Sequence, residues 1–172
     1  MPVAKSLVIG YGNAYCHDDG VALYVINELR RLYGIRDLQP DDEGLDELGH
    51  EFDSVMLHQL VPEVVSLVAD YSLVIFVDAH LGHLPEDVRI IKVQEEHRFH
   101  AVTHHMSPGM ILSLTRQAKG ISPKGYLVSV KGENFNFGLG ISVPCRLAAD
   151  EAIKKILDLL GSPSPELLAP PH

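Results

Sequence analysis

The chain has 172 residues, of which 46% are hydrophobic and 22% charged, a composition typical of one soluble globular domain with a full core. Its formal net charge of −9 argues against broad nucleic-acid binding, which needs a basic face. No apolar run approaches the roughly 18 residues that cross a bilayer, and no separate apolar signal segment precedes the first likely strand. Two cysteines are too few for a disulfide framework, so we expect a cytoplasmic protein that contacts neither nucleic acid nor membrane.

Five short apolar runs predict β-strands, because they are rich in branched and aromatic residues and are bounded by polar or turn residues. In chain order they cover residues 6–9, 52–57, 73–77, 88–93 and 126–130. The third run, LVIFV, is the most strand-like part of the chain and ends at Asp78.

The first helix is expected directly after the first strand. Asp18 or Asp19 would be its N-cap, and it would run to about Tyr33, where Gly34 ends it. The acidic segment that follows, residues 35–50, is poorly periodic and is expected to be a surface loop with room for one helical turn.

Three further helices are predicted from proline at the first helical turn, where its missing N–H costs nothing. They begin at Pro62, at Pro108 with Ser107 as N-cap, and at Pro144. The second of these ends near Lys119, and the last runs to about residue 160.

Alternating strands and helices predict an α/β fold, a three-layer α/β/α domain with a mostly parallel, twisted sheet of about five strands. We expect residues 1–161 to form this single domain, and the proline-rich residues 162–172 to form a flexible tail.

Ionisable side chains gather where such a sheet forms its sites, beyond the carboxyl ends of the strands. Asp18 and Asp19 follow the first strand, Asp78 ends the third, and His104 and His105 lie between the fourth strand and the next helix. Two carboxylates and an imidazole can hold a divalent ion such as zinc or nickel and leave positions open for other ligands. Each residue alone also has a plainer explanation, as a helix cap, a strand end or a solvated loop histidine.

Other motifs fit the glycine-rich turn less well. A dinucleotide-binding GxGxxG would need glycine where the chain has Tyr15, and neither a phosphate-binding GKS or GKT nor a GxSxG nucleophile turn occurs. A cysteine hydrolase built on Cys16 and His17 is a weak alternative, because adjacent residues do not normally face each other.

Four segments resemble the nickel–iron hydrogenase maturation peptidases. Residues 10–22, GYGNAYCHDDGVA, are similar to that family's GxGNxxxxDDGxG, with Ala22 in place of the last glycine. Residues 58–79, HQLVPEVVSLVADYSLVIFVDA, and residues 104–114, HHMSPGMILSL, look like the subgroup that serves bidirectional, NAD(P)-linked hydrogenases, although Ser107 replaces the usual aspartate. Residues 134–142, NFNFGLGIS, resemble the family's DFxFGxxLS, so the likeness covers about residues 6–160 in the same order.

The resemblance implies an endopeptidase that removes a C-terminal extension from the hydrogenase large-subunit precursor after nickel insertion. It implies that Asp19, Asp78 and His104, with His105 as the reserve, contact nickel that the precursor supplies. Zinc or cadmium are other divalent ions that the same residues would accept.

The resemblance leaves the chemistry of cleavage open. Asp19 and Asp78 would be the acids of an aspartic-type mechanism, or the metal would polarise the scissile carbonyl or activate water. Asn13 would orient the turn or stabilise an oxyanion, and His58 and Gln59 would contact the substrate tail. Two alternatives remain: a metal-binding docking module without peptidase activity, and an unrelated small-molecule hydrolase.

Overall fold

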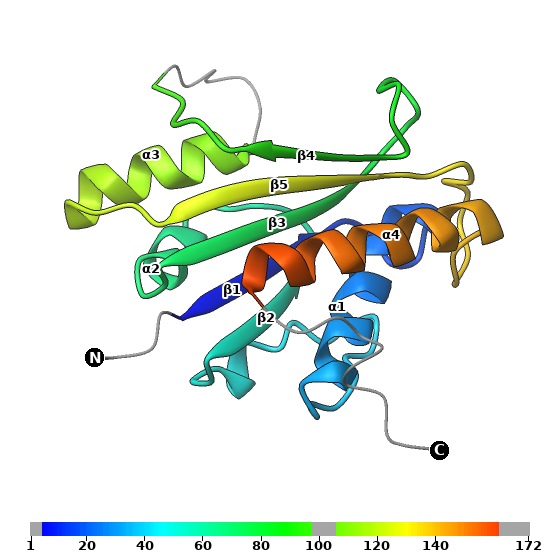
Figure 1. Ribbon diagram of the computed structural model, residues 1–172, viewed down its shortest axis with the longest axis horizontal. Coiled ribbons are helices and arrows are strands. Elements are labelled where there is room, and N and C mark those ends of the chain that lie inside the picture. Colours follow the sequence, from blue (N-terminus) through cyan, green and yellow to red (C-terminus); the bar gives the residue numbers. More distant parts are fainter. Residues whose placement is uncertain (1–4, 98–105, 162–172) are drawn as a thin grey trace.

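The computed structural model describes residues 5–97 and 106–161 and is built around a five-stranded sheet (Figure 1). The strands are β1 (Ser6–Tyr11), β2 (Phe52–Leu57), β3 (Leu73–His80), β4 (Val88–Lys92) and β5 (Lys124–Lys131). Their order is β2-β1-β3-β5-β4, and every pair is parallel except β4 with β5. This confirms the mostly parallel sheet.

Helices cover both faces of the sheet, as the sequence predicts (Figure 1). They are α1 (Val21–Leu32), α2 (Val64–Val68), α3 (Pro108–Lys119) and α4 (Val143–Leu160), with 3₁₀ turns η1 (His17–Gly20) and η2 (Leu45–Glu47). None of them, within the described ranges, is long and apolar enough to cross a membrane. The tail predicted for residues 162–172 falls outside the described residues.

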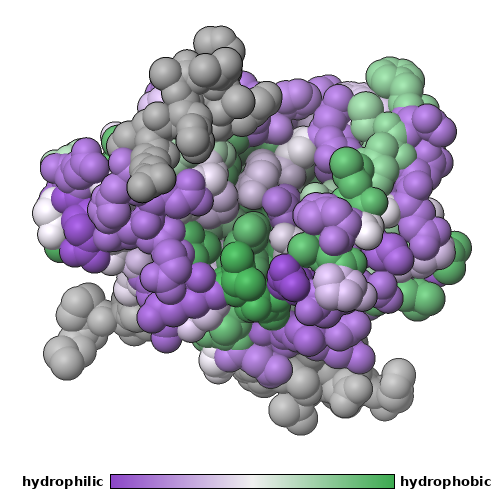
Figure 2. All heavy atoms as spheres, turned by 90° about the horizontal axis from the view of Figure 1, so that it is seen from above, coloured by the Kyte–Doolittle hydropathy of each residue, from purple (hydrophilic) through white to green (hydrophobic). Residues whose placement is uncertain are grey.

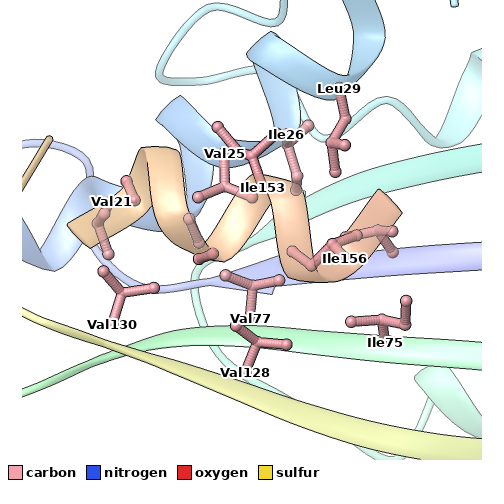
Figure 3. Packing of buried hydrophobic residues seen from close by; sticks show 14 of the residues in the cluster. Val21, Val25, Ile26, Leu29, Ile75, Val77, Val128, Val130, Ile153 and Ile156 are labelled. Carbon is pink, nitrogen blue, oxygen red and sulfur yellow. The ribbon is translucent and has the colours of Figure 1, made fainter. Parts of the chain in front are cut away.

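Each face of the sheet carries its own apolar core, because successive side chains of a strand point to opposite faces. Val8, Ile75 and Val77 belong to the core under α1 and α4, whereas Leu7, Ile9 and Phe76 belong to the core under α2 and α3. Figure 3 shows the first core, with side chains of both helices pointing onto the sheet: Val21, Val25, Ile26, Leu29, Ile153 and Ile156. Burial on both faces explains why these strands read as continuous apolar runs.

Figure 2 shows one face of the molecule on which hydrophilic side chains surround a central group of apolar ones. Such a surface is ordinary for a domain whose apolar side chains are largely used in its cores.

Helix starts agree with the sequence at α3 and α4 but differ at the first two helices. The helix predicted from Pro62 begins at Val64, because Pro62 and Glu63 belong to the turn that precedes α2. Ser107 accepts a hydrogen bond from the Met110 N–H at 3.2 Å, which confirms it as the N-cap of α3.

The prediction that Asp18 or Asp19 caps α1 is wrong: both lie inside η1, and α1 starts at Val21 with no side-chain cap among the described residues. The reason is that both carboxylates accept hydrogen bonds from other parts of the chain.

Candidate functional site

The turn after β1 is held tight by Gly12 and Asn13. Gly12 has φ +140°, and a Cβ there would lie 2.2 Å from the Asp19 carbonyl oxygen, so the backbone needs glycine. The Asn13 N–H donates to Asp19 Oδ2 at 2.8 Å, and Asn13 Oδ1 accepts from the Tyr15 N–H at 2.9 Å. Asn13 therefore orders the turn and fixes the Asp19 carboxylate.

Asp18, the first acid of the pair, is fully buried and anchors a distant loop, residues 132–142. Its carboxylate accepts from the N–H groups of Glu133 at 2.8 Å, Asn134 at 3.0 Å and Ser142 at 2.7 Å, and from the Ser142 hydroxyl at 2.7 Å. Burial would raise its pKa, but these hydrogen bonds outweigh burial, and the pKa is held below its usual value. With its oxygens occupied in this way, Asp18 has a structural role.

Asp78 lies near the carboxyl end of β3, and only one of its two carboxylate oxygens has a hydrogen-bond partner among the described residues. Its Oδ2 accepts from the Tyr11 hydroxyl at 3.0 Å, whereas its Oδ1 is buried without a hydrogen-bond partner in the described part of the chain. Burial raises its pKa, although the Ser129 and Tyr11 hydroxyls and the nearby His80 act in the opposite direction. Ser129 is the register neighbour of Asp78 in β5; it favours the carboxylate without completing a hydrogen bond to Oδ1. The site thus contains a desolvated carboxyl group with free acceptor capacity.

The three-residue segment after Gly10 connects the two predicted acids. Tyr11 donates to Asp78, and Asn13 donates to Asp19, so both carboxylates are fixed by residues two positions apart. The turn η1, which contains Asp19, also contacts β3 directly. Both acids therefore lie at the carboxyl ends of adjacent strands.

The predicted histidine ligands fall outside this geometry. His104 and His105 belong to residues 98–105, which the structure does not describe. Among residues 5–97 and 106–161, no three His, Cys, Asp or Glu side chains come close enough together to enclose a metal ion. The metal set of Asp19, Asp78 and His104 thus stays a prediction.

Three further residues surround Asp78 that the sequence analysis did not single out: Tyr11, Ser129 and His80. His80 is buried, with Nδ1 accepting from the Gly82 N–H at 3.1 Å and Nε2 3.1 Å from the Glu86 carbonyl oxygen. Period-two alternation places Tyr11, Asp78 and Ser129 on the sheet face of α2 and α3, but only the strand order makes them neighbours.

A cleft opens beside the turn, between Asn13, the segment 40–43, the end of β2 and Phe137, with a volume of about 560 Å³. His58 lines this cleft and also a neighbouring one of about 380 Å³, which Gln59 lines. The structure thus places Asn13, His58 and Gln59 along adjoining clefts, whereas Asp19 and Asp78 line neither of them in the described structure.

The cysteine-hydrolase alternative gains no support. Both cysteines are free thiols, and burial raises the pKa of Cys145 to about 12. The ring of His17 is turned toward the 132–142 loop, where Nδ1 lies 2.9 Å from the Gly140 carbonyl oxygen. His17 therefore takes part in fixing that loop.

No family model and no curated protein matches the sequence, but solved structures share its fold. The hydrogenase maturating endopeptidase HybD from Escherichia coli superposes with a TM-score of 0.65 at 20% identity, covering 91% of this chain and 92% of that chain. A NiFe hydrogenase maturation protease, HycI from Thermococcus kodakarensis, gives 0.61 at 18% identity, with 92% and 94% covered. A hydrogenase 2 maturation peptidase from a Thaumarchaeota archaeon gives 0.59 at 17%, with 91% and 98% covered. The chain therefore has the fold of these proteases over nine-tenths of its length.

Proposed function

We propose that the protein is a hydrogenase maturation endopeptidase that removes the C-terminal extension of a nickel–iron hydrogenase large-subunit precursor after nickel insertion. The observation that carries this proposal is Asp78, a desolvated carboxyl group with one unpartnered oxygen, next to the turn that fixes Asp19. The fold shared with known maturation proteases supports it.

Nickel enters this proposal as part of the substrate. Asp19, Asp78 and His104, with His105 as the reserve, would complete the coordination of the precursor's nickel when the two proteins dock. An incomplete ligand set suits this task, because it leaves positions for ligands from the partner. A precursor without nickel would bring no positive charge to offset the carboxylates and would therefore dock less well. In this way the enzyme would distinguish precursor that has received nickel from precursor that has not.

Cleavage requires a water molecule to attack the scissile carbonyl and a proton to reach the leaving amine. In an aspartic-type reaction Asp78, whose pKa is raised by burial, would hold and donate that proton, while the Asp19 carboxylate would accept one from the water. In a metal-assisted reaction both acids would instead ligate nickel as carboxylates, and a proton of the attacking water would pass to the amine. The docked nickel would add Lewis-acid polarisation of the carbonyl. We thus assign both acids to the reaction, whether it is aspartic-type or assisted by the substrate's metal.

The test compares nickel-loaded and nickel-free precursor. We expect the purified protein to trim the nickel-loaded form and to leave the nickel-free form intact, as measured by mass spectrometry. Asp19→Asn and Asp78→Asn should each abolish trimming, whereas Asp158→Asn, an exposed acid on α4, should leave it unchanged. His104→Ala and His105→Ala, compared side by side, identify the histidine.

Circular dichroism is the control, because each variant must keep the native spectrum. Equal trimming of both precursor forms would reject nickel reading, and normal trimming by the Asp19 and Asp78 variants would reject the site. Stable binding of the precursor with no loss of mass would instead identify a docking module without peptidase activity.

A further inference from the structure

The cleft beside Asn13 is lined by acids on one side. Asp41, Asp42 and Glu43 come from the loop between α1 and β2, and no lysine or arginine of residues 5–97 and 106–161 lines the cleft. Asp42 pairs with Arg36 at 3.5 Å, but Asp41 and Glu43 form no ion pair with any described residue. Tyr15 fixes Asp41 by donating its hydroxyl proton to Oδ2 at 2.8 Å. The cleft therefore presents negative charge that the described part of the chain leaves unbalanced.

The rest of the cleft combines polar side chains, such as Asn13 and His58, with apolar ones, and one of its apolar side chains is strongly exposed. Met56 and Leu57 are buried and line the cleft from the end of β2, whereas Phe137 is 84% exposed. The loop backbone at Phe137 is held in place, since the Gly138 N–H donates to the Tyr15 carbonyl at 2.7 Å and Asp18 anchors both ends of the loop. A large aromatic side chain that an ordered backbone exposes at the edge of a cleft is typical of a binding surface.

A second cleft extends the first. It shares Glu43, Leu57 and His58 with it and continues along apolar residues, among them Val61 and Leu67. Two adjoining clefts of about 560 and 380 Å³ fit an extended chain better than one compact ligand. We call the two clefts together the acidic groove.

We propose that the acidic groove binds an extended peptide segment that carries lysine or arginine together with apolar side chains. Its source, which rests on the proposed function, is the C-terminal extension of the precursor. The cationic side chains pair with Asp41 and Glu43, and the apolar ones pack against Phe137 and Leu57.

Charge favours this occupant over the two other candidates. A second copy of the chain, with a net charge of −9, would bring another acidic molecule to the groove. The chain's own residues 162–172 contain Glu166 and neither lysine nor arginine.

The test measures peptide binding directly, by fluorescence anisotropy at low salt. One fluorescein-labelled nonapeptide carries two lysines and two leucines among glycine and serine residues; in the other, glutamate replaces lysine. We expect the lysine peptide to bind at least about tenfold more tightly, and its affinity to fall as salt screens the charges.

Matched variants locate the binding. Asp41→Asn combined with Glu43→Gln should weaken binding of the lysine peptide about three- to tenfold, the range expected for ion pairs of two exposed carboxylates. Glu151→Gln combined with Asp158→Asn changes the net charge equally on the exposed face of α4 and should have no such effect. Phe137→Ala should also weaken binding, whereas Leu147→Ala, at another exposed apolar position, should not.

Equal affinity for both peptides, or equal loss in the two charge variants, would overturn the proposal. The proposal would also be overturned if the protein sedimented as a homodimer that did not bind the lysine peptide and that Phe137→Ala dissociated. The assay contains no precursor and measures no cleavage. If the protein binds the lysine peptide but never trims precursor, the acidic groove is supported and the proposed function is rejected. If it trims precursor but does not distinguish the two peptides, the proposed function is supported and the acidic groove is rejected.

Discussion

Asp18 is fully buried and Asp78 is half-buried with a buried Oδ1, and their surroundings shift the pKa values of the two carboxyl groups in opposite directions. Four hydrogen bonds stabilise the charged form of Asp18, whereas Asp78 receives one from Tyr11 and keeps a buried oxygen without a partner among the described residues. A native carboxylate that is well satisfied stabilises the fold, and one that is not costs stability. The two residues therefore differ in what they do for the molecule.

Substituting Asp18 by asparagine should therefore destabilise the protein, whereas the same substitution at Asp78 should not. At pH 7 we expect Asp18→Asn to lower the free energy of unfolding by about 2–4 kcal/mol, because buried donors lose a charged acceptor. Asp78→Asn should leave it unchanged or raise it by about 1 kcal/mol, since asparagine still accepts from Tyr11 and carries no charge to desolvate. Urea unfolding monitored by circular dichroism gives both values.

The pH dependence follows from the direction of each pKa shift. The pKa of Asp18 is lowered in the folded state, so its contribution is present above the unfolded value of about 3.9 and is lost as the pH falls through the folded value. The loss of unfolding free energy caused by Asp18→Asn should therefore become smaller as the pH falls below about 3.9. The pKa of Asp78 is raised, so the wild type loses stability as the pH rises from about 3.9 through the folded value. Equal losses of unfolding free energy in Asp18→Asn and Asp78→Asn would contradict the different roles given to these two residues.

At the scale of elements, the turn after β1 depends on one close backbone approach. Gly12→Ala should cost about 3 kcal/mol or more, because its Cβ would lie 2.2 Å from the Asp19 carbonyl oxygen and its φ is +140°. Gly34→Ala is the matched control: its φ is +71°, but no atom lies within 4 Å, so about 1 kcal/mol is expected. Thermal unfolding of the two variants distinguishes crowding from strain, and equal losses would show that the contact with Asp19 does not matter.

Elements defined by local pattern could be predicted from the sequence. The strand at 52–57 and the helix that Ser107 caps have the expected bounds, because burial on both faces and a serine–proline start are visible within a few residues. The predicted start of α1 was wrong because the hydrogen-bond partners of Asp18 lie 115–124 positions further along the chain. A side chain that would cap a helix in isolation instead accepts from a loop that only the tertiary fold brings near.

The site divides in the same way. Asp19 and Asp78 could be placed at the carboxyl ends of two strands, because the run of elements predicts a parallel sheet. The contribution of Tyr11 depends on strand order: β1 is the direct neighbour of β3, and alternation along a strand does not report which strands are neighbours. The exposed Phe137 is also a tertiary result, since its position depends on Asp18 and Tyr15.

Across the whole molecule, stability comes from two apolar cores and from the contact between distant segments at Asp18. The sheet is covered on both faces, and the turn after β1 is joined to the 132–142 loop by hydrogen bonds within the chain. Asp19 and Asp78 belong to neither core. We therefore expect the described elements to hold together without an ion, so that a metal contacted by these acids would act in docking and cleavage.

Removal of metal should accordingly leave the isolated protein folded. We expect the same midpoint of thermal unfolding before and after treatment with EDTA, because no element of either core depends on ligation by Asp19 or Asp78. Trimming of nickel-loaded precursor should survive the same pretreatment of the enzyme, once EDTA is removed, since the nickel arrives with the substrate. A fall of several degrees in the midpoint after EDTA, restored by adding nickel, would instead identify a resident structural metal.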